Sequence, residues 1–322
     1  MKSFIRFIKN WTLPVAMFLG IISYLIFAFF PPLEPAANFF APVFDAILPF
    51  FMFLILFVTF CKVDFHKLIP VKWHLWVSIQ QVAFVFLIVA LVLWFHLTGD
   101  SLILMEAVLT CIIGPCAAAA PVVTAKLGGN LEEMTTYTFL SNFITALLIP
   151  ICFPIIDKAA DISFLTAFLD IFYEVCLVLI LPMLLAFIVK HTMHRFHHWI
   201  CGVKDLSYYL WGCSLMIVTG TTVKNIVHAN TTASFLFLIA ALGLILCIIQ
   251  FATGRFIGHY FNSTVEAGQA LGQKNTAFAI WIAYTYLNPL SSVGPGCYIL
   301  WQNIINSAEI CICRRKGLEQ ST

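Results

Sequence analysis

Ten apolar runs, each about as long as a membrane span, follow one another along the chain and constrain its fold more than any other feature. They cover residues 11–30, 41–61, 73–97, 102–125, 133–156, 163–189, 206–227, 232–254, 265–287 and 293–313. A helix needs about 20 mostly apolar residues to cross the hydrocarbon core. Because 61% of the 322 residues are hydrophobic and only 10% are charged, a water-soluble protein is excluded. The sequence predicts an all-α integral membrane protein with ten transmembrane helices.

The basic residues indicate an orientation and exclude one class of partner. A net charge of +2 provides no basic patch of the kind that binds nucleic acid, so no nucleic-acid partner is expected. Lys and Arg concentrate in the cytoplasmic loops of membrane proteins. With the N-terminus inside, fourteen basic residues fall on the inner side and two, Lys158 and Lys224, on the outer side. We therefore expect a multi-pass protein of the plasma (inner) membrane with both termini in the cytoplasm.

The first run follows a basic stub, as a signal peptide would. It is too long for a signal peptide and lacks a small-residue cleavage site, so we interpret it as the first span. Ten spans divide into two halves of five with opposite orientation, which is the arrangement of inverted-repeat transporters. We expect the repeats at 1–157 and 158–322 within one membrane domain.

The fourth run contains the residues that interrupt helices. Pro121 lacks a backbone donor and clashes with the carbonyl group of Ala117, so the break is expected between Gly114 and Pro121, beside Pro115. Thr124 either satisfies a carbonyl freed by the break or bonds back within its own helix. The corresponding ninth run is also interrupted, and paired interruptions point to a binding site between the two halves, whereas either one alone is typical of an ordinary kink.

The ninth run holds Lys274, the one basic residue that is assigned to neither the inner nor the outer side, next to Gln273. A cation at the centre of a membrane helix costs about 2.5–3.5 kcal/mol on insertion scales. Lys274 is therefore expected to face a wet cavity or a partner, the alternative being that it snorkels to the interface. If the helix breaks here, Asn275 and Thr276 are candidates to cap its second half, where an anion would be favoured.

Polar residues also recur in the third, fifth and tenth runs. In the fifth run they are three and four residues apart, so they share one helix face. Such side chains either line a cavity or hold neighbouring helices together. The residues concerned are Thr138, Ser141, Asn142 and Thr145 in the fifth run, Gln80 and Gln81 in the third, and Gln302, Asn303 and Asn306 in the tenth.

Acidic and histidine residues are the remaining candidates for catalysis, proton transfer and metal binding. Intramembrane acids are functional candidates by default, and Asp170 and Glu174 are possible proton carriers; Glu106 and Glu309 lie within or at the ends of runs. The histidines at 191, 194, 197 and 198 fit either a metal site or an interfacial basic helix. No catalytic motif was found, so neither an enzyme nor a cofactor is expected.

Four stretches of the chain resemble the bile acid:sodium symporter family, a superfamily that includes sodium-coupled carriers of bile acids, pantoate and related organic anions. They are LPFFMFLILFVTFCKVDFHKL in the second run, the broken fourth run ending at Gly129 and Asn130, LGQKN in the ninth run and LWQNIINSAE in the tenth. The resemblance implies a panel domain and a core domain, with the fourth and ninth helices unwound and crossing beside two sodium sites.

Carried over position by position, the resemblance shows a departure from the family pattern. The span-nine motif E-L-G-x-Q-N falls on residues 270–275, where Ala270 replaces the sodium-coordinating glutamate and Lys274 replaces the glutamine. The serine and asparagine of the span-four T-A-S-N stretch fall on Ala120 and Pro121. The span-three glutamine corresponds to Gln80 or Gln81, and the span-five hydroxyls correspond to Ser141 and Thr145.

This departure removes a negative ligand and adds a positive side chain. Two unit charges about 4 Å apart interact by roughly 4 kcal/mol at an effective dielectric constant of 20, so ordinary sodium binding at both sites is not expected. We expect the Lys274 ammonium to stand where a sodium ion sits in relatives, and it is also a candidate proton-coupling group. The predicted function is alternating-access transport of a small or amphipathic organic anion, with coupling left open between sodium, protons and uniport.

The main alternative is a membrane receptor that keeps the fold and binds without translocating. Membrane lipid is the other expected partner, and the sequence leaves open whether the protein is a monomer or a homodimer.

Overall fold

The computed structural model describes residues 11–33, 35, 50–51, 53–62, 68–156, 165–166, 169, 172–173, 177, 181–203, 206–227 and 231–319. Within these residues the chain is helical, apart from turns and one isolated β-bridge. This confirms the all-α prediction. The residues expected to carry protons, Asp170 and Glu174, lie outside the described residues.

The helices of the first half are α2 (Thr12–Phe29), an apolar helix at Phe53–Lys62, α4 (Lys72–Trp94), α5 (Asp100–Ile113), α6 (Ala120–Lys126) and α7 (Leu131–Ile156), with a 3₁₀ turn at Pro31–Leu33. The helices of the second half are α9 (Leu181–Thr192), α10 (His194–Gly202), α11 (Leu206–Val227), α12 (Ala233–His259), α13 (Thr264–Gly272), α14 (Thr276–Tyr286) and α15 (Val293–Glu319), with a 3₁₀ turn, η4, at Pro289–Ser292.

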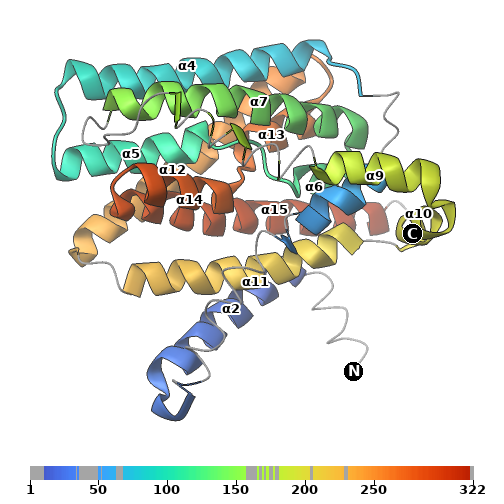
Figure 1. Ribbon diagram of the computed structural model, residues 1–322, viewed down its shortest axis with the longest axis horizontal. Coiled ribbons are helices and arrows are strands. Elements are labelled where there is room, and N and C mark those ends of the chain that lie inside the picture. The colour runs from blue at the N-terminus through green and yellow to red at the C-terminus, as the bar shows by residue number, and fades with distance from the viewer. Residues whose placement is uncertain are drawn as a thin grey trace.

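Most helices lie side by side along the long axis of the molecule, while α2 crosses beneath α11 at a slant (Figure 1). Among the described helices, α4, α7 and α12 are long and apolar enough to span a membrane. Large apolar side chains such as Trp94 (81% exposed) and Phe237 (76% exposed) cover the outer surface. An apolar surface of this extent is typical of contact with lipid, so the fold is that of a multi-pass membrane protein.

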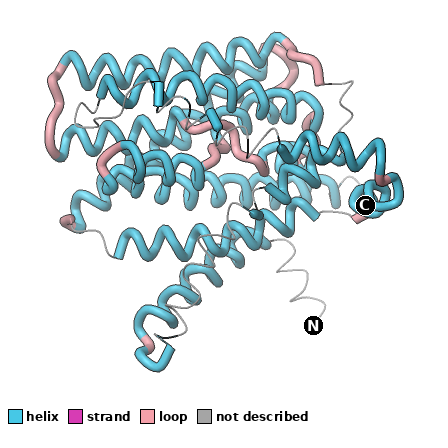
Figure 2. The backbone as a smooth tube through the Cα atoms, in the orientation of Figure 1, coloured by secondary structure: helices cyan, strands magenta, loops and turns pink. Residues whose placement is uncertain are grey.

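Both predicted interruptions are present. The fourth apolar run forms α5 and α6, separated by residues 114–119, and the ninth forms α13 and α14, separated by residues 273–275. Figure 2 shows these non-helical stretches in the middle of the helical stack. Helix α5 ends at Gly114, and Pro121 is the second residue of α6, where its missing N–H removes no helical hydrogen bond.

Close helix contacts at glycine hold α12 against α13. A Cβ atom at Gly254 would collide with the carbonyl group of Ala267, and one at Gly268 would lie 2.7 Å from Cγ of Arg255. Helices α2 and α11 cross in the same way, because a Cβ atom at Gly20 would collide with the backbone of Met216. Small residues let membrane helices approach closely and gain dispersion energy, so these two pairs form tightly packed units.

Candidate functional site

The two interrupted helices meet at a short antiparallel backbone pairing. The N–H of Ala117 donates to the carbonyl oxygen of Gln273 (2.9 Å), and the N–H of Asn275 donates to that of Pro115 (2.8 Å). These bonds place Cys116 opposite Lys274. The pairing satisfies backbone groups that the interruptions remove from helical bonding, which is necessary in a medium without water.

Carbonyl groups at the C-terminal end of α5 accept hydrogen bonds from side chains of other helices. The amide nitrogen of Gln81 on α4 lies 3.3–3.5 Å from the carbonyl oxygens of Ile112, Ile113 and Gly114. The hydroxyl of Thr145 on α7 donates to the Ile113 carbonyl (3.0 Å). Since the last carbonyls of a helix lack partners within it, these side chains complete the end of α5.

Ser141 on α7 stabilises the same break as a hydrogen-bond acceptor rather than as a donor. Its hydroxyl oxygen accepts a hydrogen bond from the N–H of Cys116 (2.8 Å). Of the alternatives for the fifth run, Ser141 and Thr145 thus hold neighbouring backbone segments together. By contrast, Thr138 and Asn142 bond within their own helix, to the carbonyls of Met134 and Thr138.

The second interruption is held by residues of α15. Gln302 accepts from the backbone N–H of Lys274 (2.9 Å) and donates to its carbonyl (3.1 Å). The hydroxyl of Tyr298 donates to the carbonyl of Gly272 (2.9 Å). Gln250 on α12 donates both to Tyr298 (3.0 Å) and to the carbonyl of Cys111 (3.3 Å), so one chain of hydrogen bonds joins the two interrupted helices.

Asn275 caps α14 as predicted. It is the N-cap residue, and its side-chain oxygen accepts from the N–H of Phe278 (3.3 Å). Thr276 does not share this role: it is the first residue of α14, and its N–H donates to the Lys274 carbonyl (2.9 Å). The N–H of Ala279 also bonds to Asn275, so much of the donor capacity at this helix start is used within the chain.

Lys274 is buried at the centre of this arrangement, with 1% of its surface exposed. The snorkelling alternative is therefore wrong for this residue. Its ammonium group has no hydrogen-bond partner among the described residues, and neither do the side-chain nitrogen and oxygen of the adjacent Gln273. A fully buried cation without a partner is strongly unfavourable, which makes this position the strongest candidate for contact with a bound molecule.

The structure also tests the predicted contacts of Thr124, of Gln80 and Gln81, and of Asn303. Thr124 is fully buried, but its hydroxyl bonds to nothing among the described residues, so neither of its predicted bonds is present. Of Gln80 and Gln81, only Gln81 is buried and reaches the break. Asn303 is buried and donates to Ile299 within its own helix (2.7 Å), while its side-chain oxygen has no partner in the described part of the chain.

Ala120 and Pro121 begin α6 and are both buried. Neither side chain carries an oxygen, so they cannot replace the serine and asparagine ligands implied by the family pattern. Ala270, also fully buried on α13, likewise offers no side-chain ligand. The described residues thus lack side-chain ligands at these three positions of the implied sodium sites.

Acidic and histidine residues near the ends of the helices have structural partners. The carboxylate of Glu106 accepts from the N–H of Asn288 (3.2 Å). Glu309 forms an ion pair with Arg255 and accepts from Gln269 (3.3 Å). Among the described residues, no cluster of three or more potential metal ligands is present, so the histidines form no such cluster.

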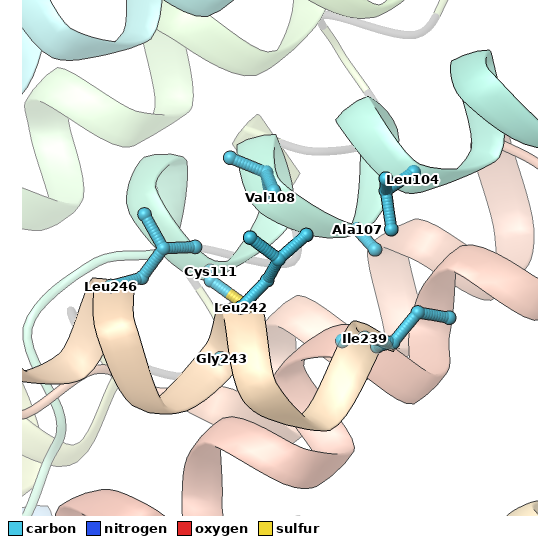
Figure 3. Close-up of a pocket in the computed structure, with 9 residues that line it drawn as sticks. Leu104, Ala107, Val108, Cys111, Ile239, Leu242, Gly243 and Leu246 are labelled. Carbon is cyan, nitrogen blue, oxygen red and sulfur yellow. The ribbon is translucent and has the colours of Figure 1, made fainter. Parts of the chain in front are cut away.

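A pocket lies between α5 and α12 (Figure 3). Its lining is apolar apart from the Cys111 thiol and includes Val108, Leu242, Leu246 and Gly294. This pocket offers an anion no charged side chain and only the weak thiol donor, so it is not the candidate site.

Comparison with known families decides the relationship of this chain. A family model described as the sodium bile acid symporter family matches residues 49–229, more than half of the chain. The chain belongs to the sodium bile acid symporter family. No curated protein matched the chain significantly. The matched segment contains α5, α6 and α7 together with Gln81, and it ends before α12.

Membership in the sodium bile acid symporter family makes the chain a member of a transporter family rather than an enzyme family. The half of the crossing built from α13, α14 and α15, which includes Ala270 and Lys274, lies outside the matched residues.

Proposed function

We propose that the chain is a secondary transporter that moves a small or amphipathic organic anion by alternating access, with the Lys274 ammonium in place of a coupling sodium ion. Its ten spans would form inverted repeats at 1–157 and 158–322, with both termini in the cytoplasm and the plasma (inner) membrane as its location. Family membership supports transport, and the interrupted helices support a site at their crossing.

The buried ammonium of Lys274 is the observation that carries this proposal. It has 1% exposure and no partner among the described residues. Removing one partner of a buried ion pair costs about 3–5 kcal/mol. A negatively charged ligand that pairs with Lys274 would relieve a cost of this size, which favours its binding. A carboxylate of the transported anion is the natural counter-ion, and the unpartnered amide of Gln273 offers it a further donor.

The charge of Lys274 and the hydrogen bonding of nearby carbonyls argue against a sodium ion in the same place. Hard cations bind to oxygen ligands. The side-chain oxygens of Gln273 and Asn303 have no partner among the described residues, but the carbonyls of Ile113, Gly272 and Lys274 already accept hydrogen bonds from side chains. Ala270 contributes no carboxylate. A sodium ion would also be repelled by a charged Lys274 nearby. We therefore expect transport that does not require a sodium gradient.

Uptake into proteoliposomes tests this function, with radiolabelled pantoate and taurocholate as probes of the two anion sizes. We expect uptake of at least one probe to be unchanged when sodium is replaced by choline. Lys274→Gln is expected to lower uptake at least tenfold, because the positive charge that attracts the carboxylate is gone. Lys72→Gln, which removes a charge from the exposed start of α4, is the matched control and should leave uptake unchanged.

Two outcomes would contradict the proposal. Sodium-dependent uptake by the unmodified protein would overturn the substitution of sodium by Lys274. Uptake by Lys274→Gln equal to that of the unmodified protein would overturn its role in anion binding. The double variant Ala270→Glu with Lys274→Gln restores the family pattern, and we expect it to acquire sodium dependence.

A receptor that binds without translocating is the second candidate. It is favoured by one observation: side chains donate to and accept from the backbone of both interruptions, as in Gln302 with Lys274, so these backbone groups do not need an ion as their partner. Saturable binding of a probe in detergent without any flux in proteoliposomes would favour the receptor.

A further inference from the structure

Among the described residues, the side-chain hydrogen bonds that fix helix α10 to the end of the helix Phe53–Lys62 lie along one side of it. The Nε2 atom of His197 lies 2.8 Å from the carbonyl oxygen of Cys61, and the thiol of Cys201 donates to the same carbonyl (3.4 Å). The side chain of Ile200 is buried, with 2% exposure. The ammonium of Lys62 also donates to the carbonyl of Val203, just beyond α10 (2.9 Å). These contacts attach α10 to the end of the helix Phe53–Lys62.

The opposite side of α10 is exposed and divided into two sectors. An ideal helix turns by about 100° per residue, which places His194, His198 and Arg195 next to one another, followed by Trp199 and Phe196. All five are exposed, including Trp199 (60%) and Phe196 (41%). The two aromatic rings stack with their centroids 5.9 Å apart. A basic sector thus lies beside an aromatic sector on the free face.

The position of α10 fits a membrane surface. It directly follows α9, an apolar helix whose last turn carries Lys190 and His191. It also lies at the end of the molecule where α15 ends (Figure 1). Tryptophan is enriched at the headgroup level of membranes, and basic residues near an anionic leaflet each contribute about 1 kcal/mol of attraction.

We propose that the free face of α10 docks on anionic phospholipid headgroups, with Trp199 and Phe196 at the acyl boundary and the basic sector on the phosphates. Charge complementarity selects this partner: the exposed polar side chains of this face are basic or histidine. The inference does not depend on the proposed transport activity.

Hydrogen exchange of residues 194–202 tests this docking in the full-length protein. The protein is placed in nanodiscs of neutral phosphatidylcholine or of phosphatidylcholine mixed with phosphatidylglycerol. We expect exchange of α10 amides to be slower in the mixed discs by about fivefold or more, the factor that corresponds to about 1 kcal/mol for one basic residue. The variant Arg195→Gln with His194→Gln and His198→Gln should lose this difference.

Controls separate docking from folding and from general charge effects. Arg195→Lys keeps the charge and should keep the difference between the two discs, as should Lys72→Gln, which removes an exposed basic residue elsewhere. Trp199→Ala should exchange faster in both discs. Equal protection in both discs would overturn the role of charge. Protection of detergent-solubilised protein by inorganic phosphate alone would assign the basic sector to a free anion and also overturn the proposal.

Discussion

Gln302 holds the backbone of Lys274 on both sides, since it accepts from the Lys274 N–H at 2.9 Å and donates to the Lys274 carbonyl at 3.1 Å. The side-chain amide of Gln302 thereby replaces the partner that a continuous helix would have supplied. The same residue that bears the buried cation therefore has its main chain fixed by α15, so the ammonium projects from a constrained position.

Loss of this amide should destabilise the protein. Gln302→Leu leaves the buried N–H of Lys274 without its partner, while the Lys274 carbonyl keeps the hydrogen bond from Thr276. An unsatisfied buried polar group costs about 1–3 kcal/mol. We expect the free energy of unfolding in mixed micelles to fall by at least that amount. A free energy of unfolding unchanged within the error of the measurement would contradict the conclusion that Gln302 stabilises the backbone at Lys274.

The adjacent glutamines on α4 provide a matched pair. Gln81→Leu removes the donor shared by the carbonyls at the end of α5, and we expect it to lower the free energy of unfolding by about 1–3 kcal/mol. Gln80→Leu makes the same chemical change at a half-buried neighbour outside the crossing and should have less effect. Equal effects of the two changes would show that Gln81 does not support the break.

Two glycines of α12 should respond oppositely to the same substitution. In Gly254→Ala the new methyl group would meet the Ala267 carbonyl, and overpacking costs about 1–3 kcal/mol, more than the helix propensity gained. At Gly243 the nearest neighbour of a Cβ atom is 3.7 Å away, so Gly243→Ala should be neutral or stabilising by up to about 1 kcal/mol. Thermal unfolding in detergent distinguishes the two, and a stable Gly254→Ala protein would argue against the close contact.

The reactivity of the Cys201 thiol at different pH values tests whether α10 packs against the body of the protein. Burial raises the pKa of Cys201, and the nearby Lys62 and Lys190 lower it by less. Because only the thiolate reacts, alkylation at neutral pH should be slower than for a free thiol and should accelerate at higher pH. Peptide mass spectrometry across a pH series measures this rate. Lys190→Gln is expected to slow the reaction further, and a midpoint at or below that of a free thiol would contradict the predicted shift.

Much of the crossing could be predicted from the sequence, because its causes are local. Pro121 lacks a backbone donor and crowds the carbonyl group of Ala117, which favours a break before it, and a lysine in an apolar run indicates burial beside a cavity or partner. Asn275 is a typical N-cap residue. These features need no knowledge of distant residues, and the structure has the breaks, the buried Lys274 and the cap where they were expected.

The side chains that hold the breaks were harder to predict. Tyr298 and Gln250 were missed, although an isolated glutamine in the apolar run of α12 was an available signal. Their partners are backbone carbonyls far away in sequence, and sequence periodicity shows only which face a residue occupies. The prediction for Thr124 was wrong for a related reason. Its sequence neighbourhood suggested a hydrogen bond to a nearby carbonyl, but its hydroxyl has no partner among the described residues. The ten-span count and the repeat boundaries remain predictions.

The backbone pairing of Ala117 with Gln273 and of Asn275 with Pro115 has a mechanical consequence. These two hydrogen bonds link the inner ends of four half-helices, α5, α6, α13 and α14. We expect a gating movement that keeps both bonds to carry the four half-helices together, with the displacement occurring against the surrounding helices.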